Sequence, residues 1–404
     1  MSKFFTRERF GHPQVFAGIL LLIFLAQCVW LASKKQPQMP DWEQMARIHW
    51  GLHLWGKPAF TNAHAALHTG PPGDLQSSLR LDKDHSALWF LTASAPFVLC
   101  PNANLEKCIE SHLYLAMVPN MVFALLLGAS LWYVARRLYG NIGGYIALTF
   151  YCFSPKIILS SAMWFSPPEM GAAWGAFGAI FTAIAVSHTL YAPREVVLWN
   201  WRRILLLGLS FALAAGSQYS LIVLVPIALL FMFYLAPMRK QAALAIWVCA
   251  CAVACVLLFA AYGFHASQFF DAIHKADFLG LIWQAFTVVD AYTALLRHLA
   301  ELGPAVLAPL PVVLIVYVLW RRARYFGNTT PLLVAVFLLI LSIGSPHYPG
   351  FGFGLMAVPF LFVFISGVIA DMLETENRMI VLSAIGVVLL AGAICNVWQL
   401  AHPG

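Results

Sequence analysis

Two groups of side chains in the N-terminal quarter of the chain could carry out proton transfer. Asp41 and Glu43 are two carboxylates with one residue between them, at the start of a stretch whose apolar residues have helical spacing. Two close carboxylates raise the pKa of one of them toward a value useful for a general base. Asp84 and His85 place an acid beside an imidazole further along. For Asp41, a simple helix N-cap is the competing interpretation.

Histidines gather in the same part of the chain. Six of the 13 lie between residues 34 and 112: His49, His53, His64, His68, His85 and His112. The pairs 49/53 and 64/68 have i, i+4 spacing, which puts both imidazoles of a pair on one helix face, where they could bind a divalent metal. No HExxH pattern accompanies them, so a metal at His49 and His53 competes with an ordinary interfacial histidine pair.

The composition indicates which structural elements position these side chains. The 404 residues are 61% hydrophobic and only 10% charged, with a mean hydropathy of +0.78, whereas a soluble domain carries about 25% charged residues. Lipid must therefore be the solvent, and backbone amides in lipid must be satisfied within helices. We predict one all-α transmembrane domain over 1–404, a bundle of about 11 spans near 14–33, 113–135, 142–163, 168–188, 204–219, 220–236, 241–263, 302–320, 329–345, 352–370 and 379–397.

The sequence also predicts an orientation. Residues 14–33 could be a signal peptide, but Gln27 stands before Cys28 where a lipoprotein cleavage box needs a small residue, so we interpret an uncleaved first helix. With the N-terminus in the cytoplasm, 14 of the 24 Lys and Arg residues fall on short inner loops, as the positive-inside rule expects. Twelve of the 17 acidic residues fall outside. We expect a multi-pass protein of the bacterial cytoplasmic membrane, and no basic soluble module indicates nucleic acid.

Two long external (periplasmic) loops, 34–112 and 264–301, hold the polar groups. Residues 41–55 suit an amphipathic helix lying on the membrane surface, and 86–100 is too short to span, which favours a re-entrant or interfacial segment. The second loop carries Asp271, His274, Lys275, Asp277, Asp290, Arg297, His298 and Glu301; it lines an entrance for acceptor or lipid, or it is a plain connector. Cys100 and Cys108 lie outside, where a disulfide is permitted.

Several short motifs follow one another in a fixed order. They are DWE at 41–43, DHSALW at 84–89, ARRLYG at 135–140, FSP at 153–155, SPPE at 166–169, GLSFALAAGSQYS at 208–220 and SPHYPGFGFGLMAVPFL at 345–361. Their order resembles the GT-C fold of membrane glycosyltransferases, in the branch of protein O-mannosyltransferases and lipid A aminoarabinose transferases. The resemblance is spread over roughly residues 14–370, and it implies a GT-C-like bundle with interfacial helices in the first external loop.

The chain departs from the family pattern at several motif positions. Trp42 separates the two carboxylates that are adjacent in the family, and Ser86 and Ala87 replace two prolines. Gln218 stands where the family has a lysine, and His347 stands where it has an arginine. Two basic contacts to phosphate are therefore missing or changed.

The resemblance implies an inverting transfer of a sugar from a polyprenyl-phosphate donor to an acceptor at the outer face. Asp41 is the candidate base, Glu43 its partner and Asp84 a second acid. His85 would contact phosphate or a metal, since some GT-C enzymes use a divalent ion. The other candidate substrate-binding residues are Arg47, Glu169, Gln218, Tyr219, His347 and Tyr348. Arg47 could equally form a surface salt bridge, and Glu169 could cap a helix.

Two other functions compete with this interpretation. A non-catalytic membrane subunit of a larger complex would keep the fold and lose the chemistry, and the replaced motif residues motivate that reading. A secondary transporter would need polar residues at mid-membrane in broken helices or paired halves. The predicted spans are poor in charge and no halves match, so the transporter ranks last. The sequence names neither the sugar nor the acceptor.

Overall fold

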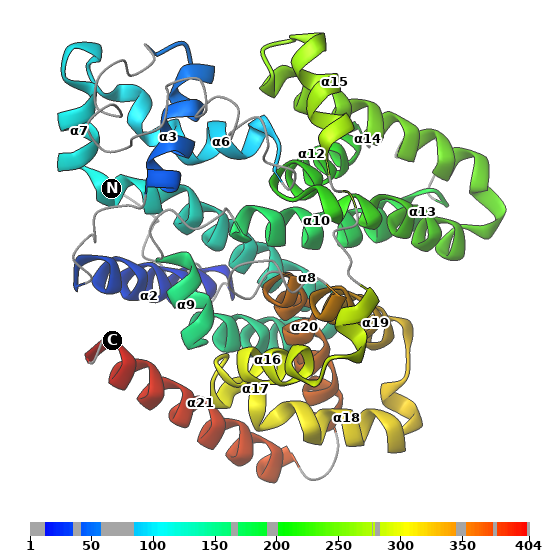
Figure 1. Cartoon of the computed structure of the whole chain (residues 1–404). Coiled ribbons are helices and arrows are strands. Elements are labelled where there is room, and N and C mark those ends of the chain that lie inside the picture. Colours follow the sequence, from blue (N-terminus) through cyan, green and yellow to red (C-terminus); the bar gives the residue numbers. More distant parts are fainter. Residues whose placement is uncertain are drawn as a thin grey trace, which may run out of the picture. The chain divides into compact units, whose positions relative to one another are not determined.

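The described part of the chain is almost entirely helical in the computed structural model (Figure 1). The structure describes residues 13–34, 42–57, 85–162, 169–191, 201–276, 278, 283–344, 353–374 and 378–401. No strand occurs among these residues. The first external loop, expected from the sequence to carry interfacial helices, contains α3 (Trp42–Leu54) and α6 (Ala87–Ser94).

Seven helices in the described ranges are long and apolar enough to cross a membrane. They are Pro13–Lys34, Tyr114–Cys152, Glu169–Thr189, Pro237–Ala261, Phe326–Gly344, Gly354–Leu373 and Met379–Trp398. Three shorter elements coincide with further predicted spans: α12 (Trp201–Ser217), α13 (Leu224–Leu235) and α18 (Pro309–Leu319). The chain is an all-α polytopic membrane protein.

Helix α8 (Val118–Cys152) contains a break at Gly140. Its 35 residues would measure about 50 Å as one straight helix, well beyond the roughly 30 Å of a bilayer core. Gly140 adopts φ 74° and ψ −174°, a backbone conformation that glycine reaches without steric cost. The break lies between the two spans that the sequence predicts at 113–135 and 142–163.

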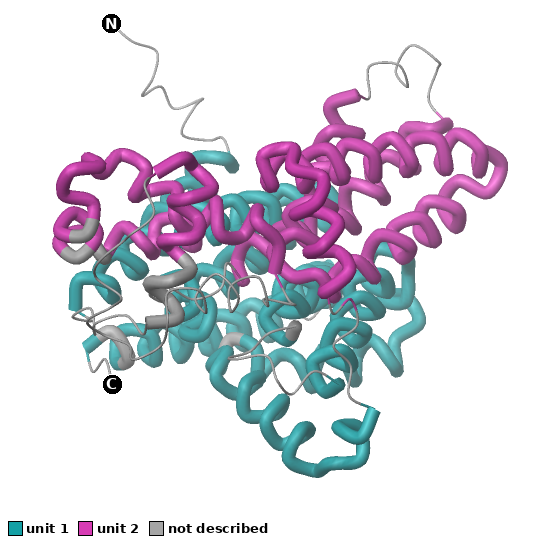
Figure 2. Tube along the Cα trace, turned by 45° about the horizontal axis from the view of Figure 1, so that its top comes forward, with its two compact units in different colours: residues 1–36, 121–163, 281–404 teal, residues 37–120, 164–280 magenta. Residues whose placement is uncertain are grey.

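The chain divides into two compact units, which are coloured separately in Figure 2. The first unit comprises residues 1–36, 121–163 and 281–404, and the second comprises 37–120 and 164–280. Besides most of α8, the first unit contains α2 (Pro13–Lys34), α9 (Pro155–Ser161), η7 (Trp283–Thr287), α16 (Val289–Ala300), α17 (Pro304–Leu307), α18, η8 (Arg321–Ala323), α19 (Phe326–Gly344), α20 (Phe353–Leu373) and α21 (Arg378–Ala401). The prediction of a single domain over 1–404 stays a prediction.

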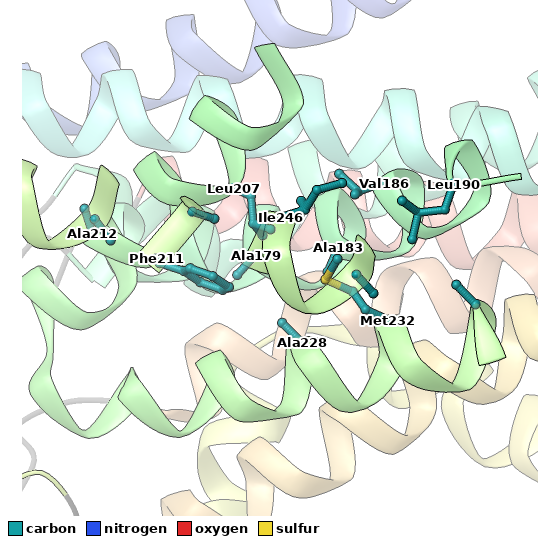
Figure 3. Close-up of a cluster of buried hydrophobic side chains, with 14 residues drawn as sticks. Ala179, Ala183, Val186, Leu190, Leu207, Phe211, Ala212, Ala228, Met232 and Ile246 are labelled. Carbon is teal, nitrogen blue, oxygen red and sulfur yellow. The ribbon is translucent and has the colours of Figure 1, made fainter. Parts of the chain in front are cut away.

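The second unit holds the remaining elements. Besides α3, α6, α12 and α13, these are η2 (Ala95–Leu99), η3 (Asn102–Asn104), α7 (Leu105–Ser111), η4 (Leu113–Met117), α10 (Glu169–Thr189), η5 (Tyr219–Val223), η6 (Pro237–Arg239), α14 (Lys240–Ala261) and α15 (Ala266–Lys275). Helices α10, α12, α13 and α14 share a core of mostly small side chains (Figure 3). Larger side chains such as Phe211 and Met232 fill the space between them.

Close packing of α10 on α12 depends on glycine. A Cβ atom added to Gly175 would lie 2.5 Å from the backbone nitrogen of Ala214. Backbone atoms cannot move aside as a flexible side chain can, so this contact sets the distance between the two helices. Small residues at such contacts are the usual basis of helix association in lipid, where no hydrophobic driving force acts between helices.

The first unit has polar networks at the ends of its helices. Asn328 Nδ2 donates to Asp371 at 2.9 Å, and the Tyr139 hydroxyl donates to the Gly327 carbonyl at 2.6 Å. Arg322 and Glu374 form an ion pair of 2.6 Å. All of these groups come from segments that the sequence predicts at the inner face, so the packing agrees with the predicted alternation of spans.

A second network joins groups predicted at the outer face. Lys156 Nζ lies 2.6 Å from Glu301 Oε2, and His298 Nδ1 lies 3.4 Å from the same oxygen. Partial burial alone would raise the pKa of Glu301, but the hydrogen bonds and positive charges of Lys156 and His298 lower it below its ordinary value. The network therefore favours the charged carboxylate.

We expect Gly175→Ala to lower the stability of the second unit by about 1–3 kcal/mol, because the added methyl group overlaps backbone that cannot yield. Gly18→Ala is the matched control, since Gly18 is also a helical glycine and its added Cβ would meet nothing within 4 Å. Thermal unfolding of both variants in detergent measures the difference. Equal midpoints for the two variants would contradict the proposed contact.

Candidate functional site

A cavity of about 530 Å³ opens in the second unit where three segments meet. These segments are the C-terminal end of α3, the start of α6, and the corner between α14 and α15. The cavity is lined by Trp50, His53, Leu54, His85, Phe90, Tyr262, Gly263, His265, Ser267, Gln268, Asp271, Ala272 and Lys275. It combines aromatic walls with several groups that can carry charge.

The wall formed by α3 and α6 depends on a close helix contact. A Cβ atom on Gly51 would overlap the carbonyl oxygen of Phe90 and the side chain of Ser94. The rings of Trp50 and Phe90 meet edge to face with centroids 4.3 Å apart. Trp55 Nε1 donates to the Leu91 carbonyl at 3.0 Å. These contacts hold the C-terminal half of α3 against α6.

Ser86 fixes the start of α6 and thereby the position of His85. Its backbone N–H donates to the Gly216 carbonyl at 3.0 Å and its hydroxyl donates to the same oxygen at 2.7 Å. The hydroxyl also accepts from Leu88 N at 3.2 Å, as an N-cap. A proline has no N–H to donate. The serine that departs from the family motif thus ties α6 to the end of α12.

The third segment that lines the cavity begins at a turn with strained backbone. Gly263 and Phe264 both have positive φ, 60° and 61°, and for a residue with a side chain this conformation costs roughly 1–2 kcal/mol. The corner turns the chain from α14 into α15. Phe269 and Ala272 of α15 pack toward the cluster around Tyr262. The polar residues of α15 that line the cavity are Ser267, Gln268, Asp271 and Lys275, and Ala272 lines it as well.

Two predicted substrate-binding residues lie behind this wall. The hydroxyl of Tyr219 is 2.9 Å from that of Tyr262, and both side chains are buried. Tyr219 therefore supports a residue of the cavity wall. Gln218 is buried as well, and its Nε2 donates to the Ser220 hydroxyl at 3.3 Å. Neither residue is among those that line the cavity.

The groups that can be charged in the cavity are mostly basic. They are Lys275, His53, His85 and His265, with Asp271 as the one carboxylate among the lining residues. His265 Nδ1 lies 3.1 Å from the Tyr262 carbonyl; donation to that oxygen leaves Nε2 as the other polar atom of the ring. Ammonium and imidazolium groups make strong, charge-assisted hydrogen bonds to anions, so the cavity can bind an anionic group.

The structure describes only some of the remaining site residues that the sequence predicts. Asp41, Asp84, His347 and Tyr348 lie outside the described residues, so the expectation that Asp41, Asp84 and His85 share one cavity stays a prediction. Glu43 and Arg47 lie on α3, with only their backbone described. Glu169 is the first residue of α10, and His49 is a half-buried residue of α3.

The expected metal at His49 and His53 has no assembled site in the part of the chain that is described. There, no group of three or more His, Cys, Asp or Glu side chains is arranged to hold a metal ion. A metal at this pair stays a prediction.

Sequence reasoning missed much of the α14–α15 wall. It marked Asp271 and Lys275 in the second external loop, but it did not single out Tyr262, His265 or Gln268. The spacing of Ser267, Asp271 and Lys275 at i, i+4 and i+8 indicates one helix face, and it could have been recognised. The corner at Gly263 and Phe264 has no comparable sequence signal.

A disulfide closes the short segment after η2, on which α3 packs. Cys100 and Cys108 are joined, with a Cα–Cα distance of 5.9 Å. The closed loop contributes to a small core in which Ile48 and Leu52 of α3 pack against Phe97, Leu105 and Ile109. Lys57 Nζ also donates to the Cys100 carbonyl at 2.8 Å. The bond therefore stabilises the surface on which α3 rests.

Comparison with known proteins gives a likeness of fold. No protein-family model matches the chain, and no curated protein matches its sequence. Among solved structures, the chain is similar to the archaeal oligosaccharyltransferase AglB from Archaeoglobus fulgidus, in complex with an inhibitory peptide and a dolichol-phosphate. The TM-score is 0.52 and the identity 12%, over 96% of this chain and 55% of that one. The chain thus spans about half of the AglB length, and the likeness shows a shared fold alone.

Ser86→Ala removes the shorter of the two hydrogen bonds to the Gly216 carbonyl. We expect a loss of about 1–2 kcal/mol, because the bond is buried. Ser383→Ala is the control, since the exposed Ser383 hydroxyl bonds only within its own helix, to the Met379 carbonyl. Thermal unfolding in detergent compares them, and a Ser86→Ala midpoint as high as that of Ser383→Ala would rule out the tie between α6 and α12.

Reduction of the Cys100–Cys108 bond should loosen α3. The short loop between the two residues predicts a contribution of about 2.5 kcal/mol from restricting the unfolded chain. Hydrogen exchange of the α3 amides, measured with and without reductant, should show faster exchange after reduction. The amides of α20, in the other unit, serve as the internal control, and equal acceleration in both helices would contradict a local effect.

Proposed function

We propose that the chain is a membrane glycosyltransferase that moves a sugar from a polyprenyl-phosphate donor to an acceptor at the outer face of the cytoplasmic membrane. The observation that carries the proposal is the likeness of fold to AglB over 96% of this chain, because that structure contains a dolichol-phosphate. The ordered motifs between residues 41 and 361 support it independently, since they include the carboxylate pair that the transfer needs.

The reaction follows from the groups available at the head of α3. Asp41 accepts the proton of the acceptor hydroxyl, and the acceptor oxygen forms a bond to the anomeric carbon. The bond from that carbon to the phosphate oxygen breaks on the opposite side, so the configuration inverts and the polyprenyl phosphate leaves with the electron pair. Glu43 keeps a second negative charge near Asp41, which raises the affinity of the pair for a proton.

The position of the cavity at the end of an apolar helix supports a substrate that is associated with the membrane. Tyr262 and Gly263 follow directly on a helix long and apolar enough to span the membrane, Pro237–Ala261. Phe264 and Phe270 are exposed beside it, and aromatic side chains are enriched where spans meet the polar headgroups. A lipid-linked or membrane-associated substrate would reach the cavity without leaving the bilayer.

Asp41→Asn should reduce sugar transfer by at least about 10²–10⁴-fold, because the amide cannot accept the acceptor proton. Mass spectrometry of lipids that copurify with the protein first identifies the polyprenyl-phosphate sugar. Consumption of that lipid by reconstituted protein then gives the rate.

Asp290→Asn is the control for loss of one carboxylate, because Asp290 lies on α16 and is exposed. Both variants should unfold at the wild-type temperature. Unchanged transfer by Asp41→Asn would remove Asp41 from the mechanism.

A second candidate function is a non-catalytic membrane subunit that keeps the fold. It is favoured by the use of motif positions 86 and 218 in buried structural hydrogen bonds, with serine and glutamine in place of the family's proline and lysine. Purification in mild detergent separates the two functions: a subunit copurifies with a partner in fixed stoichiometry and consumes no lipid-linked sugar.

A further inference from the structure

Basic side chains gather at the end of the second unit where α12 and α14 begin. Arg202 and Arg203 lie in the first turn of α12, and Arg239 and Lys240 lie at the start of α14. Acidic residues are almost absent from this part of the sequence, because residues 170–270 contain five Lys or Arg side chains and one carboxylate. This stretch of the second unit therefore has a clear excess of positive charge.

Helices α12 and α14 run in the same direction, so their first residues lie at the same end. A Cβ atom added to Gly208 would lie 2.7 Å from the side chain of Val253, and one added to Gly216 would lie 2.8 Å from that of Leu258. Residue numbers therefore rise together along the two helices. With this register, the first turn of α12 lies beside the second turn of α14, roughly 10 Å along the helix axis from the first residue of α14.

Exposed aromatic side chains accompany these basic residues. Trp201 is 52% exposed, and Tyr234, in the last turn of α13 shortly before α14, is 73% exposed. The guanidinium carbon of Arg202 lies 5.6 Å from the centre of the Trp201 ring. Trp and Tyr are enriched where membrane spans meet the lipid headgroups. We therefore expect the basic residues beside them to lie at the depth of the headgroups.

Two of the basic residues begin an exposed apolar stripe on their own helix, Arg202 on α12 and Lys240 on α14. The exposed residues of these stripes are Leu205, Leu206 and Leu209 on α12, and Leu244 and Val248 on α14. Their spacing from the basic residue, three or four and then seven or eight positions, puts them on the same helix face. A phospholipid on either face can place its headgroup at the cation and its acyl chains along the stripe.

We propose that this basic end of the second unit binds anionic phospholipids of the surrounding membrane. Arg202 and Lys240 contact the negatively charged headgroups, and the apolar stripes contact the acyl chains. Arg203 has a different role, since its Nη1 donates to the Ala185 carbonyl of α10 at 3.1 Å. Charge complementarity favours an anionic lipid, because a zwitterionic headgroup has no net negative charge for these cations to attract. Such binding is independent of the sugar transfer proposed above.

The experiment uses the full chain in mild detergent, with phosphatidylglycerol and phosphatidylcholine of identical acyl chains as the probes. Native mass spectrometry measures the affinity for each lipid. We expect phosphatidylglycerol to bind about fivefold more tightly, which is the gain expected from one Lys or Arg near an anionic headgroup. This preference should shrink as the ammonium acetate concentration rises, because salt screens exposed charges.

Charge-removing variants locate the binding surface. Arg202→Gln and Lys240→Gln together should bring the affinities for the two lipids to within about twofold of each other. The matched control removes two exposed positive charges elsewhere, by Lys107→Gln on α7 and Arg297→Gln on α16. The control pair should keep the wild-type preference, and both double variants should unfold at the wild-type temperature.

Several results would overturn the proposal. They are equal affinities for the two lipids in the wild type, an unchanged preference in the variant of Arg202 and Lys240, and loss of the preference in the control pair, which would show an effect of net charge alone. Glycerophosphoglycerol tests whether the acyl chains matter, because it has the headgroup without them. We expect it to leave binding of phosphatidylglycerol unchanged; full competition at equal concentration would identify a soluble anion as the occupant instead.

Discussion

Each backbone amide inside a bilayer has to find its hydrogen-bond partner within the protein, because hydrocarbon offers none. This requirement makes every membrane segment of the chain a helix and moves most polar chemistry to the helix ends. Its consequences are visible in both units. In the first, Lys156 pairs with Glu301 at one end of its helices, and Arg322 pairs with Glu374 at the other. In the second, the cavity opens beyond the last residues of α14.

Helices in lipid associate through close packing, because no hydrophobic effect drives them together, and small residues allow that packing here. Gly175 lets α10 approach the backbone of α12, and Gly51 lets α3 approach α6. Each contact is close enough that a methyl group would overlap another residue. Hydrogen bonds add to this packing: Ser86 makes two to the Gly216 carbonyl, which join α6 to the end of α12.

These contacts show which structural roles the residues at the altered motif positions have. Gln218 and Tyr219 are buried and bonded to neighbours, so they shape the wall behind the cavity. The basic side chains that line the cavity come from α3, from the segments that precede α6 and α15, and from α15 itself. Lys275 of α15 and His265, which immediately precedes α15, are examples. A changed motif is thus compatible with a site that binds an anionic group.

By itself, the sequence determined that the protein is an all-α polytopic membrane protein, because composition and apolar run length depend only on local residues. It also identified the pair Cys100 and Cys108, which form a disulfide, since their spacing is local as well. Only the tertiary structure decided that His53, His85 and Lys275 line one cavity. These residues are far apart in the chain, and their meeting depends on helix crossings and on the Gly263–Phe264 corner. Such crossings are set by side-chain packing between distant segments, which no single window of sequence contains.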